Sequence, residues 1–256
     1  MAEVISSHRP LLMGLLASQP TLVADLRWLD QVDSTNALLV SDLSQQAAGA
    51  WSIRIATNQT AGRGRQGRSW ESPIGSVPIS VAVPLSHFES TPSWLSMLTA
   101  IALKNSLQKY VSEPIQIKWP NDCLFSSGKF AGILIERTTD HAVIGIGINF
   151  FAAPRIASAT HLGVTDYLPA LADFLLKLAD LIELASGLTD EQVRDLVTAE
   201  LSTIGQQVEV QLTSSEQLVG VATGITDQGA LVIDTNLGLV EIVAGDVVHL
   251  RPANAS

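Results

Sequence analysis

The chain has 256 residues, of which 46% are apolar and 16% charged, and Cys123 is its single cysteine. A chain of this length can bury a large core, so we expect one large or two unequal domains rather than a fold stapled by disulfides or metal. Lysine and arginine number 15 against 25 aspartates and glutamates, and the resulting charge of −10 argues against nonspecific DNA binding.

The first 26 residues are expected to form an N-terminal extension. Their apolar stretch predicts one short helix around residues 11–17, far shorter than the roughly 18 residues of a membrane span. The extension also lacks the basic start and small-residue cleavage site of a secretory signal, so we expect a cytoplasmic protein.

Strands and helices follow in turn along the rest of the chain. Apolar runs and alternation predict strands at residues 27–33, 51–57, 77–85, 115–119, 123–125, 130–137 and 142–150. Helical spacing predicts a helix capped by Ser34 and further helices at residues 94–110, 168–186 and 189–201. Pro78 would place its strand toward a sheet edge or delay the start of the strand, because proline donates no ladder hydrogen bond.

A different pattern begins after Gly205. Five short alternating segments in about 50 residues, separated by turn signals, predict a small barrel. We therefore expect an extension at residues 1–26, a main domain at 27–203 and a barrel domain at 204–256.

The segment Gln59–Trp70, QTAGRGRQGRSW, alternates glycine with arginine inside a long loop. Gly62, Gly64 and Gly67 fit the dinucleotide-binding pattern G-x-G-x-x-G, but Ser72-Pro73 prevents the helix that would have to follow. Glycine permits close approach to a ligand, and each arginine can offer a planar pair of donors to carboxylate or phosphate. The segment reads either as an anion-binding flap or as a solvated basic loop.

Three later segments also carry polar groups where a cavity could use them. Lys118–Asp122 (KWPND) is a turn that could direct a cation, an amide and a carboxylate to one place, or an ordinary polar turn. Lys129 opens an apolar strand, where it could hold an anion or reach out to water. Gly145 and Gly147 interrupt a strand, which leaves room for a flat ligand or a packed helix, and Asn149 can read a base edge.

Other common signatures are missing from the sequence. The five histidines show no metal-ligand spacing, and there is no G-x-S-x-G, Walker A or C-x-x-C motif. Redox, serine-hydrolase and P-loop chemistry therefore have no support.

Five motifs, in this order, resemble those of the biotin protein ligases. They are DSTN at residues 33–36, QTAGRGRQGR at 59–68, KWPND at 118–122, KFAGILIE at 129–136 and GIGIN at 145–149. The resemblance implies an α+β fold: a mixed central β-sheet with helices packed on it, as in class II synthetases, plus a small C-terminal SH3-like β-barrel. It implies the monofunctional type, because the residues before Asp33 are too few for an N-terminal helix-turn-helix domain.

The resemblance also implies a two-step reaction. The carboxylate of biotin attacks the α-phosphate of ATP, giving biotinyl-5'-AMP and pyrophosphate. A lysine of the biotin carboxyl carrier protein of acetyl-CoA carboxylase then displaces AMP. ATP and biotin are the substrates, Mg²⁺ is expected only with ATP, and no metal site of the protein itself, DNA or membrane partner is expected; the protein would be a monomer or homodimer.

Roles are carried over by matching the motifs. Lys129, Arg63 and Asp122 are expected to be catalytic, with Lys129 on the carboxylate and α-phosphate oxygens and Asp122 orienting or deprotonating the acceptor lysine. The expected biotin-binding residues are Ser34, Thr35, Asn36, Gln59, Arg63, Gly64, Arg65, Lys129 and Gly132. The expected ATP- or adenylate-binding residues are Arg65, Arg68, Trp70, Lys118, Asn121, Lys129 and Asn149.

The chain departs from the family at Ser76-Val77-Pro78, where relatives carry a Gly/Asn-Leu-Tyr start to the strand. At these positions the resemblance therefore does not specify how the biotin pocket is lined. Three rival functions are a lipoate-type ligase or acyltransferase, a nonenzymatic biotin-binding module and a nucleic-acid-binding module. Lipoate-type ligases lack the combination of GRGRxGR and KWPND that this chain carries. The negative net charge argues against the nucleic-acid-binding module.

Overall fold

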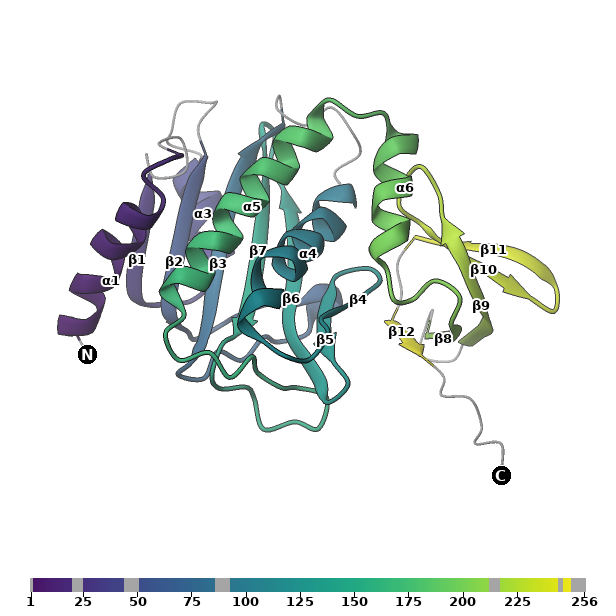
Figure 1. The fold of residues 1–256 in the computed structure, drawn as a ribbon, viewed down its shortest axis with the longest axis horizontal. Coiled ribbons are helices and arrows are strands. Elements are labelled where there is room, and N and C mark those ends of the chain that lie inside the picture. Colours follow the sequence, from purple (N-terminus) through teal and green to yellow (C-terminus); the bar gives the residue numbers. More distant parts are fainter. Residues whose placement is uncertain are drawn as a thin grey trace.

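The computed structural model describes residues 2–19, 25–43, 51–85, 93–211, 217–243 and 246–249. These residues form two β-sheets, a large one covered by helices and a small one at the C-terminal end (Figure 1). Among the described residues, none of the helices is long and apolar enough to span a membrane.

The large sheet has seven strands in the order β1-β2-β3-β7-β6-β5-β4. Its strands are β1 (Leu26–Val32), β2 (Ser52–Gln59), β3 (Ser76–Pro84), β4 (Gln116–Lys118), β5 (Asp122–Phe125), β6 (Gly128–Arg137) and β7 (His141–Asn149). Only β1 and β2 pair in parallel, and the other neighbours are antiparallel. The sheet is therefore mixed, as the α+β prediction requires.

Helices lie on both faces of this sheet. On these faces lie α1 (Ala2–Leu15), α3 (Thr35–Leu43), α4 (Ser93–Leu107) and α5 (Leu168–Ser186). Helix α6 (Asp190–Glu200) packs against α4, and short 3-10 turns form η1 (Arg65–Gly67) and η3 (Gln108–Tyr110). In Figure 1, α1, α5 and α4 cross the near face and α3 lies behind the sheet. Because both faces are covered, β3 is buried along its whole length and β7 at every residue except half-buried Gly145.

Two predictions about these elements were wrong. The helix expected around residues 11–17 begins at Ala2, because packing stabilises a longer helix: Leu12 and Leu16 are fully buried, and Arg9 Nε donates to Leu26 O at 2.9 Å. The strand containing Pro78 lies inside the sheet, between β2 and β7. Its pairing with β2 ends at Ile79, so at Pro78 itself the strand has a partner only on the β7 side.

The small sheet contains five antiparallel strands in the order β11-β10-β9-β8-β12. They are β8 (Gln207–Gln211), β9 (Gln217–Ile225), β10 (Leu231–Thr235), β11 (Gly238–Ile242) and β12 (Asp246–His249). Five strands after Gly205 match the expectation from alternation; Leu250 and Arg251, the end of the predicted barrel, lie outside the described residues.

The turn between β9 and β10 joins the two sheets. Trp119, almost completely buried, donates from Nε1 to Gly229 O at 3.0 Å, and its backbone N–H donates to Thr203 Oγ1 at 3.0 Å. Arg194 of α6 bonds Asp227 Oδ1 at 2.7 Å in the same turn. The KWPND segment is thus held from behind by the C-terminal part of the chain.

Candidate active site

One cavity of about 670 Å³ lies over the ends of β2, β6 and β7, beneath the Gly/Arg segment. Every residue predicted for the site lines it, from Ser34–Asn36 at the start of α3 to Asn149 at the end of β7. The cationic segment and Lys129 therefore face a shared cavity, which is the arrangement that an acyl-phosphate site requires.

The inner end of the cavity is polar and buried. Gln59 Oε1 at the end of β2 accepts from the backbone N–H of Thr35 at 2.8 Å and from Thr35 Oγ1 at 3.0 Å. Ser80 Oγ of β3 lies 2.8 Å from Thr35 Oγ1. Ser34 accepts from Ala37 N–H at 3.4 Å, as expected of a helix cap. The start of α3, the end of β2 and the middle of β3 thus fix these groups in one hydrogen-bonded array.

Asn36 is fixed within this array by groups on three strands. Its side chain accepts from Ser80 Oγ at 2.6 Å and donates to Glu136 Oε2 at 2.8 Å. Gly145 of β7 provides the space, since a β-carbon there would lie 2.5 Å from Asn36 Oδ1. The sequence left two explanations for Gly145, a flat ligand or a packed helix. The structure shows the second, because the side chain of Asn36 in α3 packs against this glycine.

Lys129 lies where the cavity widens toward solvent. Its side chain is 30% exposed, and Nζ forms an ion pair with Asp122 Oδ1 at 2.6 Å. The same ammonium stands 5.4 Å from the centre of the Trp70 ring, a cation–π distance. Gly132 makes this position possible, because a β-carbon there would lie 2.7 Å from Lys129 Nζ.

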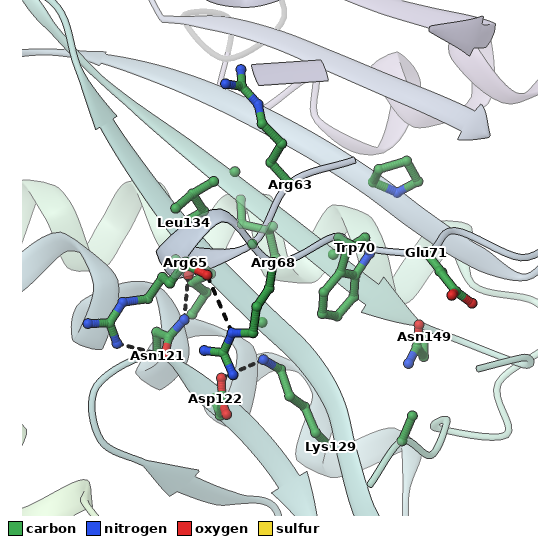
Figure 2. A pocket seen from close by; sticks show the side chains of 18 of the residues that line it. Arg63, Arg65, Arg68, Trp70, Glu71, Asn121, Asp122, Lys129, Leu134 and Asn149 are labelled. Carbon is green, nitrogen blue, oxygen red and sulfur yellow. Dashed lines mark hydrogen bonds and ion pairs between the residues drawn. The ribbon is translucent and has the colours of Figure 1, made fainter. Parts of the chain in front are cut away.

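The Gly/Arg segment forms the outer wall of the cavity (Figure 2). Arg65 Nη1 donates to Asn121 Oδ1 at 3.3 Å, and Asn121 Nδ2 donates to Ile133 O of β6 at 2.7 Å. Arg65 and Arg68 extend toward Asn121 and Asp122, whereas Arg63 points away from them (Figure 2). Gln66, within this segment, has a φ of 55°, a left-handed conformation that non-glycine residues rarely adopt.

Trp70 covers the glycine stretch of β7. A β-carbon on Gly147 would lie 2.2 Å from the indole, so this glycine leaves room for the ring of Trp70, a side chain of the same chain. The indole Nε1 and the side-chain Oδ1 of Asn149 are buried without a hydrogen-bond partner among the described residues. Asn149 Nδ2 donates to Thr160 O at 3.0 Å. A donor and an acceptor are thus left near the cavity wall.

Two segments that the sequence did not identify complete the walls. The chain after β7 passes Lys129, with Lys129 N–H donating to Ser158 O at 2.8 Å and Thr160 N–H to Lys129 O at 2.9 Å. Val247 of β12 also lines the cavity.

The sequence analysis also did not identify Ser80 and Glu136, which both bond to Asn36. For Ser80 a signal was available, because it is a polar residue within the apolar run of β3.

Thiol chemistry does not belong to this site. Burial, with a smaller effect of Asp122, raises the pKa of the Cys123 thiol, which therefore stays protonated. Within the described ranges, no three His, Cys, Asp or Glu side chains converge to hold a metal ion.

Comparisons with known proteins agree with this geometry. Residues 28–149 match the Biotin/lipoate A/B protein ligase family and residues 203–250 the Biotin protein ligase C terminal domain. The chain is 34% identical to the biotin–[acetyl-CoA-carboxylase] ligase of Mycobacterium tuberculosis, covering 88% of this chain and 90% of that protein. The chain belongs to the biotin protein ligase family.

Further relatives extend this assignment. The bifunctional ligase/repressor BirA of Escherichia coli is 30% identical over 88% of this chain and 74% of its own length. The biotin protein ligase of Aquifex aeolicus, solved in complex with biotin and ATP, has a TM-score of 0.74 and 26% identity, covering 90% of this chain and all of its own. Family membership confirms the predicted family, fold class and enzyme class.

Proposed function

We propose that this protein activates biotin with ATP and transfers it to a lysine of the biotin carboxyl carrier protein of acetyl-CoA carboxylase. The observation that carries the proposal is the shared cavity, in which a buried polar end lies next to Lys129 and the arginine flap, residues 59–70. Residues 27–203 would be the catalytic domain and residues 204–256 the C-terminal domain.

The inner end suits the ring of biotin. A cyclic urea presents one carbonyl oxygen and two N–H groups, and Thr35, Gln59 and Ser80 offer donors and acceptors at the start of α3. The positive end of the helix dipole favours the carbonyl oxygen there. The dithiolane ring of lipoate carries no N–H or carbonyl group that could bond to this polar end of the cavity, which disfavours the lipoate alternative.

Adenylation would take place at Lys129. A carboxylate oxygen of biotin forms a bond to the α-phosphorus of ATP, and the bond to the bridging oxygen breaks so that pyrophosphate leaves. Lys129 and the flap arginines stabilise the charge on the α-phosphate oxygens in the transition state. Trp70 and Asn149 would contact the adenine, since both keep an unpaired polar atom near the cavity wall. Mg²⁺ would arrive with ATP and offset the charge of the triphosphate.

Transfer would depend on Asp122. The acceptor amine must be neutral to attack the acyl carbon, and a free lysine has a pKa of about 10.4. Asp122 now pairs with Lys129 Nζ at 2.6 Å. Once Lys129 turns to the phosphate, the carboxylate of Asp122 can orient the incoming ammonium and accept its proton, and AMP leaves as the amide forms.

The decisive assay incubates the protein with biotin, Mg-ATP and the apo carrier domain, and then measures attached biotin by mass. The expected result is one biotin per carrier, with no labelling when lipoate replaces biotin. Attachment of lipoate would favour the lipoate-type ligase. Biotin binding without biotin-dependent ATP–pyrophosphate exchange would leave only a binding module.

A further inference from the structure

Glu136 stands between the inner end of the cavity and the flap, in contact with both. It belongs to β6, where it pairs with Val143 of β7, and its side chain is 32% exposed. One carboxylate oxygen, Oε2, accepts from Asn36 Nδ2 at 2.8 Å. The other, Oε1, lies 3.7 Å from Arg63 Nη2. One side chain therefore contacts the biotin end and the flap at once.

The contact with Asn36 is the firm one. Asn36 is only 5% exposed, and its amide oxygen already accepts from Ser80. The amide of Asn36 packs directly against Gly145, so closely that a β-carbon on this glycine would overlap it. Asn36 Nδ2 would therefore remain a buried donor without a partner if Glu136 lost its acceptor oxygen.

The contact with Arg63 is loose and exposed. The Arg63 side chain is 55% exposed, and an ion pair of this kind contributes little stability. Figure 2 shows Arg63 directed away from Arg65, Arg68 and Lys129, so the guanidinium is turned from the place where an acyl phosphate would form. A ligand anion that recruits Arg63 must compete with the carboxylate of Glu136.

We propose that Glu136 is a positioning residue of the proposed biotin-activating site: it fixes Asn36 at the biotin end and holds Arg63 away from Lys129 until the adenylate takes its place. Glu136 thus sets how readily the flap closes. This inference rests on the proposed function, because it needs an anionic intermediate beside Lys129.

Three variants separate the two contacts. Glu136→Gln keeps an oxygen for Asn36 but removes the charge that competes for Arg63. Glu136→Ala removes both contacts. Asp140→Asn, in the exposed turn after β6, removes the same charge elsewhere in the hairpin and is the control. Biotin affinity is measured by titration calorimetry, and adenylate release by filtration of protein loaded with labelled biotinyl-5'-AMP.

We expect Glu136→Gln to slow adenylate release about two- to fivefold with biotin affinity nearly unchanged, since an exposed ion pair is worth little. We expect Glu136→Ala to weaken biotin binding roughly tenfold, because a buried donor loses its partner. In an Arg63→Ala background, Glu136→Gln should leave adenylate release unchanged.

The inference would be overturned by a Glu136→Gln effect that persists in the Arg63→Ala background, or by equal biotin affinities for Glu136→Gln and Glu136→Ala. A slowing of release by Asp140→Asn as large as that by Glu136→Gln would also overturn it, because the cause would then be net charge. The proposed function fails separately, if the unmodified protein shows no biotin-dependent ATP–pyrophosphate exchange.

Discussion

The two ends of the cavity are built in opposite ways. At the inner end, Thr35, Asn36 and Ser80 are buried and joined by hydrogen bonds between the start of α3 and strand β3. At the outer end, Arg63 and Arg68 are exposed, and Lys129 is only partly covered. The inner end is already joined by hydrogen bonds, whereas at the outer end Arg63 and Lys129 pair with the carboxylates of Glu136 and Asp122. We therefore expect the inner end to set the affinity for biotin and the outer end to set the rate of adenylation. Substitutions at the inner end should change mainly the affinity, and those at the outer end mainly the rate or the retention of the adenylate.

The largest effect is expected from Lys129→Gln. This change removes the ammonium that meets the charge developing on the α-phosphate, so biotin-dependent ATP–pyrophosphate exchange should fall about 10²- to 10³-fold. Biotin affinity, set mainly by the inner end, should change less than about tenfold. Lys109→Gln, a surface lysine paired with Asp173, is the control. An equal loss of affinity and rate would contradict the separation of the two ends.

Gly145→Ala should damage the inner end by crowding. The added β-carbon would lie 2.5 Å from Asn36 Oδ1, and overpacking costs about 1–3 kcal/mol. We expect biotin binding to weaken about 10- to 100-fold by calorimetry. Gly224→Ala in β9 is the matched control, because a β-carbon there meets no atom within 4 Å. If both variants bind biotin alike, Gly145 does not protect the site.

Ser80→Ala tests the same end without crowding. Loss of the hydroxyl removes the donor to Asn36 Oδ1, and a hydrogen bond of this kind contributes about 1 kcal/mol. The biotin dissociation constant should rise about fivefold, while the exchange rate at saturating biotin stays the same. Ser106→Ala, whose hydroxyl bonds carbonyls of its own helix, serves as control. A lower rate at saturation would place Ser80 in the chemistry.

Arg63→Ala tests the flap. We expect loaded adenylate to leave about threefold to fivefold faster, because one charged donor to the phosphate or carboxylate is lost. Biotin affinity should fall by less. The measurement compares adenylate release with carrier labelling, and Arg137→Ala, an exposed arginine outside the cavity, is the control. Unchanged retention of the adenylate would count against a closing flap.

The smallest effect is expected from Trp119→Phe, which removes the N–H bond to Gly229 O behind the KWPND turn. The exchange rate should fall about two- to threefold, since Asn121 and Asp122 of that turn hold Arg65 and Lys129. Arg194→Ala breaks another contact of the same β9–β10 turn, with Asp227, and should leave the rate unchanged. Equal losses in both variants would mean that only the attachment of the small sheet matters.

Local patterns in the sequence predicted most of the helices and strands, the motifs and the chemistry that their residues could supply. Apolar runs and alternation predicted the strands, helical spacing predicted the helix at residues 189–201 that forms α6, and breaks at Ser72-Pro73 excluded a dinucleotide-binding helix. These features are local, so spacing and backbone preferences are enough to identify them.

Which groups meet depends on the packing of parts of the chain that are distant in sequence. Asn36 and Glu136 lie 100 positions apart in the chain and become partners because α3 packs across strands β3 and β7, with β6 beside β7. The interior position of Pro78, the early start of α1 and the bond from Trp119 to Gly229 likewise depend on long-range packing. Such contacts are set by how whole elements bury their apolar faces, which no local pattern of residues encodes.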